Sequence, residues 1–303
     1  MLGRITQGMM NTQLLRNLNS NLTRMNNLQD QLTTGRRINR PSDDPVGLSY
    51  AMRYRSDLSA TDQYQENVDT ALSWLEFTDT MLNQAGSVFQ RARELTVQGA
   101  NGTNSELALD AIKEEMKELY NQLVQIGNSE FNGKHVFNGQ RTDVNPFTEG
   151  NAANESTDDG IIEFEIGVGV RVPVNVPGNQ VFGSLKPDGT PVDDNAFKVL
   201  QNISDALDRE DFDAVREGLG KLDSRIDKFL EIRADLGAKM NRVELANERL
   251  KDISINLQTL QTKTEDADYA EVITNLKTSE NVYQASLSVG AQIIRPSLVD
   301  FLK

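Results

Sequence analysis

Residues 243–267 read VELANERLKDISINLQTLQTKTEDA, and the spacing of their apolar side chains indicates the fold class. Steps of three and four residues alternate along this stretch, which is typical of a helix that packs along one narrow stripe. The stripe consists of Val243, Ala246, Leu250, Ile253, Leu257, Leu260, Thr264 and Ala267. A related spacing of apolar residues begins upstream of Val243, after residue 211. The sequence therefore predicts one long helix over residues 211–268, with the acidic run 265–268 as the place where it could be interrupted.

Further helical stripes lie toward both ends of the chain. Residues 45–98 and 109–126 carry apolar faces wide enough to be buried in a core. Residues 8–33 and 273–294 carry only narrow stripes, which are too weak to fold as isolated helices. Their nearest partners are each other, or the same segments of neighbouring subunits. The narrow stripes and the tail beyond them comprise Leu15, Leu18, Leu22, Met25, Leu32, Ile273, Leu276, Leu287, Ile294, Leu298 and Phe301.

The middle of the chain has a different pattern. Between residues 128 and 195, Asn-Gly, Asp-Gly and Pro-Gly dipeptides mark repeated turns. Apolar side chains occupy every second position from Ile162 to Val176, which predicts a strand with one buried face. Because this alternating run is long for one strand, Gly167 and Gly169 are expected to mark a bend or bulge inside it. The sequence thus predicts a small β-rich insertion between helical regions.

Composition excludes several classes of protein. The 303 residues include no cysteine and one histidine, so cysteine-based metal sites, disulfides and thiol nucleophiles are excluded. The net charge of −14 argues against a nucleic-acid partner. Apolar runs are too short to span a membrane, and the first residues do not resemble a cleaved signal peptide. The acidic charge is uneven, because residues 1–55 hold eight arginines against three aspartates.

Motifs for chemistry are absent or better explained by structure. The glycines at 127 and 133 have the wrong spacing for a phosphate-binding loop. Asp43 and Asp44 are placed as helix caps, and Asp158 and Asp159 as a solvated turn. We therefore expect no catalytic, cofactor-binding or metal site. An enzyme built on the insertion and a cytoplasmic coiled-coil scaffold remain as alternative classes.

Several motifs together resemble the bacterial flagellin family. Residues 28–47 read LQDQLTTGRRINRPSDDPVG, in which a leucine-rich helix is followed by a Gly-Arg-Ile turn and an Asp-Asp pair that opens the next helix. The FNG at residues 131–133, LGAKMNRVE at 236–244, DADYAE at 266–271 and QA at 284–285 are also similar to that family. The turn residues that carry the resemblance are Gly35, Arg36, Ile38, Asp43, Asp44 and Pro45.

The resemblance implies an extracellular structural subunit of the bacterial flagellum, with no enzymatic activity and no cofactor. Residues 40–47, the opening residues 4–7 and the tail 296–302 look more like the subunits that join hook to filament than like filament subunits. A short filament subunit is the main rival. The implied partners are other copies in a ring, the first hook-associated protein, flagellin and an export chaperone, with export that removes no signal peptide; neither nucleic acid nor a membrane is expected.

The implied fold is mainly α-helical with a small β-rich insertion, an elongated coiled-coil-like rod built from both halves of the chain. Residues 1–40 with 270–303 are expected to form a terminal coiled-coil layer that lacks order in the monomer. Residues 41–130 with 195–269 form the helical rod, and residues 131–194 project outward. The expected rod core contains Trp74, Leu75, Leu82, Phe89, Leu119, Leu123, Leu250, Leu257 and Leu260.

Overall fold

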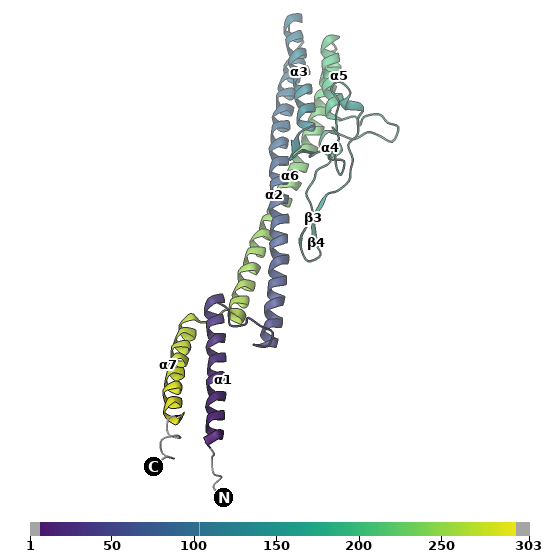
Figure 1. The fold of residues 1–303 in the computed structure, drawn as a ribbon. Helices are drawn as coiled ribbons and strands as arrows, with labels where there is room; N and C mark the ends of the chain where they lie inside the picture. Colours follow the sequence, from purple (N-terminus) through teal and green to yellow (C-terminus); the bar gives the residue numbers. More distant parts are fainter. Residues whose placement is uncertain (1–6, 103, 295–303) are drawn as a thin grey trace, which may run out of the picture. The chain divides into compact units, whose positions relative to one another are not determined.

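A computed structural model describes residues 7–102 and 104–294, and these residues are mainly helical (Figure 1). The longer helices are α1 (Gln7–Thr34), α2 (Pro45–Gly99), α3 (Glu106–Gly127), α5 (Ala196–Asp208), α6 (Phe212–Glu265) and α7 (Tyr269–Ile294). Between α3 and α5 lie β1 (Glu130–Phe131), β2 (Lys134–His135), the 3-10 turn η1 (Ala152–Asn154), β3 (Glu163–Gly167), β4 (Val170–Pro173) and the short α4 (Gly178–Phe182). The fold is thus mainly α-helical with a small β-rich insertion, as the sequence predicts.

The chain divides into two compact units, one built from the two end segments of the sequence and the other from the continuous middle segment. The terminal unit comprises residues 1–60 and 253–303, and the central unit is Thr61–Asp252. Both divisions fall inside the long helices α2 and α6, whereas the sequence suggested boundaries at residues 40 and 270. The insertion, residues 131–194, belongs to the central unit rather than standing apart from it.

The core of the protein lies in the central unit. Apolar side chains from α2, α3, α5, α6 and the insertion form one buried cluster that ends at Leu250. Seven of the expected core residues are buried: Trp74, Leu75, Leu82, Phe89, Leu119, Leu123 and Leu250. The other two lie in the terminal unit, where Leu257 is half-buried and Leu260 is 43% exposed. The expectation that Leu260 is a core residue is therefore not met, because its stripe continues past the end of the buried cluster.

An aromatic cluster joins the insertion to the helices. The ring of Phe182, which closes α4, lies 5.6 Å from that of Phe137, 5.5 Å from that of Phe147 and 5.3 Å from that of Phe197. Phe197 is the second residue of α5, and its ring also lies 5.8 Å from that of Tyr120 of α3. The Phe182–Phe197 pair is tilted and the other three pairs are edge-on, and edge-on pairs add stabilisation beyond the burial of apolar area. The insertion is thus packed on the helices by its own buried core.

The alternating run of residues 162–176 forms a hairpin rather than one bent strand. β3 and β4 pair antiparallel, with Phe164 opposite Val172, and the register shifts between Glu165 and Gly167. The chain reverses at residues 168–169, where Gly169 has φ +68°, a conformation that glycine adopts without steric cost. The two glycines therefore mark a reversal, and Val168 at its tip is 88% exposed.

A buried ion pair fastens the end of the insertion to α6. Arg225 is almost fully buried, and its Nη2 lies 2.9 Å from Oδ1 of Asp194. Its Nε and Nη1 donate to the backbone oxygens of Asp194 and Gln180. Burial alone would raise the pKa of the Asp194 carboxyl, but the hydrogen bond from Lys228 and the charge of Arg225 hold that pKa below its ordinary value.

The lowered pKa of Asp194 predicts that the central unit loses stability in acid. A carboxyl whose pKa is lower in the folded than in the unfolded chain stabilises the fold above the unfolded pKa, about 3.9. That stabilisation is lost as the pH falls through the lower, folded pKa. We expect Asp194→Asn to lower the free energy of unfolding at neutral pH by about 1–3 kcal/mol and to flatten its acid dependence.

Urea unfolding at a series of pH values measures both effects. Asp213→Asn is the matched control, because Asp213 is exposed and forms its ion pair with Arg216 on the same helix. Equal acid dependence in wild type and Asp194→Asn would contradict the assignment.

Candidate functional site

The candidate site is the pair of helices in the terminal unit. α1 and α7 lie side by side (Figure 1) and run antiparallel. At one end of the pair, the backbone of Ala267 donates to the oxygen of Gly35 at 3.0 Å. Further along, Nδ2 of Asn21 donates to the backbone oxygen of Ser279 at 3.0 Å. Gly290 is so close to Leu14 that an added Cβ would lie 2.8 Å from the Leu14 side chain.

This pair leaves much of its apolar surface uncovered. Leu18, Leu22, Met25, Leu32 and Leu276 are half-buried. Leu15 is 61% exposed, and Ile273 and Leu287 are each 46% exposed. Two helices can cover only one side of each other, so side chains on the remaining sides stay in water unless other helices pack against them. The side chain of Ile294 and the residues Leu298 and Phe301 lie outside the part that the structure describes.

The turn between α1 and α2 is shaped by the residues that carry the family resemblance. Gly35 has φ +72°, and a Cβ there would lie 2.9 Å from the hydroxyl of Tyr269. Ile38 is buried. Oδ2 of Asp43 accepts hydrogen bonds from the backbone nitrogens of two preceding residues at 3.1 and 2.8 Å. These contacts fix the path of the chain as it leaves α1.

The start of α2 follows from the same turn. Oδ1 of Asp44 accepts a hydrogen bond from the backbone of Gly47 at 2.8 Å, so Asp44 caps the helix that Pro45 begins. Proline is favoured at the first helical position because its missing N–H would have had no partner there. Oδ2 of Asp44 also lies 3.5 Å from Nη2 of Arg37.

A buried acid lies where α6 ends. Glu265 is 1% exposed. Its carboxylate forms an ion pair with Nε of Arg36 at 2.8 Å and accepts hydrogen bonds from Nε and Nη2 of Arg55. Its backbone oxygen accepts from the nitrogen of Arg37 at 2.7 Å. Asp268 then caps α7, because its Oδ1 accepts hydrogen bonds from two backbone nitrogens of that helix. The acidic run therefore ends one helix and starts the next.

Sequence reasoning missed several of these residues. Glu265 was noted only as part of a run that could interrupt a helix, and nothing in the sequence linked it to Arg55, which is 210 positions away in the chain. No local signal in the sequence indicates that Asn21 bonds to the backbone of α7. A single apolar stripe indicates which face of a helix packs, but it does not name the polar groups that set the register.

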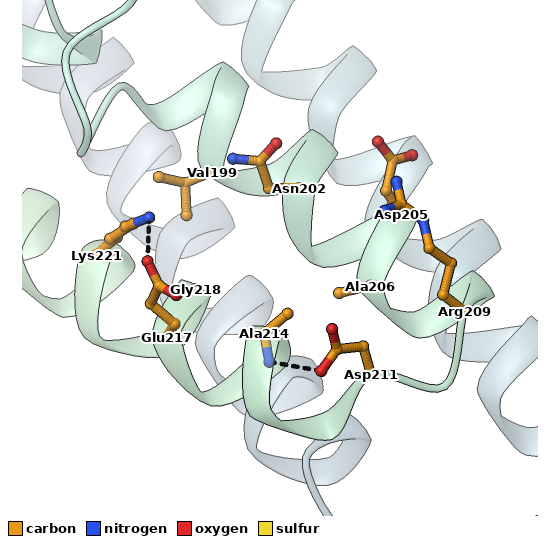
Figure 2. Close-up of a pocket in the computed structure, with 10 residues that line it drawn as sticks. All are labelled: Val199, Asn202, Asp205, Ala206, Arg209, Asp211, Ala214, Glu217, Gly218 and Lys221. Carbon is orange, nitrogen blue, oxygen red and sulfur yellow. Dashed lines mark hydrogen bonds and ion pairs between the residues drawn. The ribbon is translucent and has the colours of Figure 1, made fainter.

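Polar surface cavities carry no arrangement that suggests a reaction. One cavity of about 230 Å³ lies between α5 and the start of α6 (Figure 2). Three of its charged side chains serve helix structure: Asp211 accepts a hydrogen bond from the backbone of Ala214, and Lys221 pairs with Glu217. Among residues 7–102 and 104–294, no group of three or more His, Cys, Asp or Glu could hold a metal ion. In the same residues, no helix is long and apolar enough to cross a membrane.

Comparison with known proteins gives a consistent assignment. Residues 5–142 match the bacterial flagellin N-terminal helical region, and residues 209–302 match the C-terminal helical region. The chain is 30% identical to the flagellar filament 30.7 kDa core protein of Treponema maltophilum, over 87% of this chain and 86% of that protein. It is 24% identical to flagellar hook-associated protein 3 of Escherichia coli, over 93% and 94% of the two chains.

A solved structure has the same fold. A putative flagellar hook-associated protein from Vibrio parahaemolyticus matches with a TM-score of 0.66 at 17% identity, covering 74% of this chain and all of that one. Both terminal regions of the family and the helical fold are thus present. The chain belongs to the bacterial flagellin family and is an extracellular, non-enzymatic structural protein of the flagellar axis.

Proposed function

We propose that the chain forms the adaptor ring that joins the hook, through the first hook-associated protein, to the flagellin filament, in the manner of the third hook-associated protein. The observation that carries the proposal is the uncovered apolar surface of the α1–α7 pair, on which Leu15 is 61% exposed. Burying a leucine or isoleucine side chain stabilises by about 1.5–3 kcal/mol. Neighbouring copies that cover this surface would therefore stabilise the pair further as they assemble.

The proposed arrangement has three layers. Residues 1–40 and 270–303 form the inner coiled-coil layer, residues 41–130 and 195–269 the rod, and residues 131–194 the outward part. In the single chain the α1–α7 pair is weakly stabilised, because narrow stripes and several asparagines make α1 a weak helix by itself, and assembly completes its order. Assembly then depends on a template, and free subunits stay apart. An export chaperone would hold the C-terminal region before export. Export itself would remove no signal peptide.

The choice of junction over filament is supported by the α1–α2 turn. The Asp-Asp-Pro-Val-Gly of residues 43–47 resembles junction subunits, and Pro45 opens α2. The second candidate, a short filament subunit, is favoured by the identity to the Treponema maltophilum filament protein. In that case copies would repeat along the whole filament rather than occupy one short segment.

Deletion of the gene tests the proposal. We expect electron microscopy to show intact hooks without filaments, and we expect the filament protein to be exported into the medium unassembled, because its docking surface is missing. Filaments of normal length on the deletion strain would contradict the proposal. Loss of the exported filament protein itself would favour the filament subunit instead.

A further inference from the structure

In the ion cluster at the end of α6, the acid is buried and the two arginines are exposed to water. The Glu265 side chain is 2% exposed, whereas the side chains of Arg36 and Arg55 are 49% and 42% exposed. A buried carboxylate is costly unless cations or donors compensate it. The two arginines remain in contact with water, so losing the ion pair with Glu265 would cost them far less free energy. The ion pairs therefore stabilise the buried charge of Glu265 more than they stabilise the charges of the two arginines.

The cluster joins three segments of the terminal unit. Arg36 lies in the turn after α1, Arg55 lies on α2, and Glu265 is the last residue of α6. Backbone hydrogen bonds run beside the ion pairs, and Nη2 of Arg37 donates to the oxygen of Thr264 at 2.8 Å. Because Tyr269 begins α7 a few residues later, the position of Glu265 determines where α7 starts relative to α1.

We propose that Glu265, with Arg36 and Arg55, is a charge lock that holds the end of α6 against the α1–α2 turn and thereby sets the register in which α7 packs on α1. Either arginine alone still neutralises Glu265, so the lock tolerates the loss of one. Loss of both leaves the buried carboxylate without a cation, with the 3.4 Å hydrogen bond from Nε2 of Gln261 as its remaining side-chain contact, and this drives the joint open. The lock belongs to the single chain, so it does not depend on where in the flagellum the subunit stands.

A set of glutamine variants separates charge from packing. Amide hydrogen exchange is measured on the full chain as a monomer, for wild type, Arg36→Gln, Arg55→Gln, the double arginine variant, Glu265→Gln and the triple variant. Amides of residues 61–252 serve as an internal reference. Arg53→Gln is the matched control, since Arg53 lies on α2 and makes only a 3.9 Å pair with Asp57 on the same helix.

The expected order is specific to a buried charge. Each single arginine variant should speed exchange in α1 and α7 by less than about tenfold, and the double variant by about a hundredfold or more. Adding Glu265→Gln to the double variant should slow exchange again by about tenfold, because the unpaired buried charge is then gone. Arg53→Gln should leave exchange unchanged.

Two results would overturn the proposal. One is equal exchange of α1 and α7 in wild type and in the double arginine variant, which would show that the cluster does not hold the pair. The other is a triple variant no more protected than the double variant, which would mean that the arginines act by packing. The second comparison remains decisive even if the double variant loses protection throughout the chain.

Discussion

Removal of residues 284–303 is expected to leave a folded central unit in a subunit that no longer assembles. The deletion takes away the second half of α7, including Leu287 and the Gly290 that meets Leu14. Each apolar side chain buried on assembly contributes about 1.5–3 kcal/mol, so several lost together reduce affinity by many orders of magnitude. The core of the central unit contains none of the deleted residues.

Complementation of a deletion strain measures this effect. Cells producing the truncated chain should have hooks without filaments, while hydrogen exchange of the purified protein should show residues 61–252 protected as in wild type. Leu107→Ser serves as a control, because Leu107 is a highly exposed apolar residue of the central unit and lies outside the α1–α7 pair. Normal filament growth on the truncated subunit would show that the second half of α7 is not required.

Phe182→Ala is expected to lower the free energy of unfolding of the central unit by about 3–5 kcal/mol. Phe182 is fully buried and contacts three other aromatic rings, which come from the insertion and from the first residues of α5. Its removal leaves a large cavity that these rings can fill only by shifting together. The insertion should therefore lose its attachment to α3 and α5 before the helices separate.

Urea unfolding and hydrogen exchange of the insertion measure the loss. Phe77→Ala is the matched control: Phe77 is only half-buried, lies on α2 and meets the ring of Phe131 at 5.3 Å. Its loss should be clearly smaller. A Phe182→Ala variant that loses less than about 1 kcal/mol would contradict the role of the aromatic cluster.

Helical stripes made most of the fold predictable from the sequence. The wide apolar faces predicted within residues 45–98 and over 109–126 correspond to the buried face of α2 from Val68 to Leu95 and to that of α3, because a helix with apolar residues on one face gains stability by burying that face. The acidic run at 265–268 was recognised as an interruption, and Asp268 does cap a new helix there. Helix boundaries of this kind depend on local residues alone, which is why they can be read directly.

Features that depend on distant partners could not be predicted in the same way. Period-two alternation does not distinguish a bent strand from a hairpin. The antiparallel pairing of β3 with β4 and the positive φ of Gly169 show the hairpin. Leu260 continues the same stripe as Leu250, yet burial depends on what packs opposite each residue. The partners of Glu265 are far away in the sequence, so its burial and its two ion pairs had no local signal.

The position of the subunit in the flagellum tests the central proposal most directly. Val168 at the tip of the β3–β4 hairpin is 88% exposed, and the sequence contains no cysteine, so Val168→Cys provides a single accessible thiol. Biotin coupled to that thiol can be located by gold-labelled streptavidin on intact flagella in the electron microscope. An adaptor ring predicts gold in one narrow band between hook and filament, whereas gold along the whole filament would contradict it and identify a filament subunit.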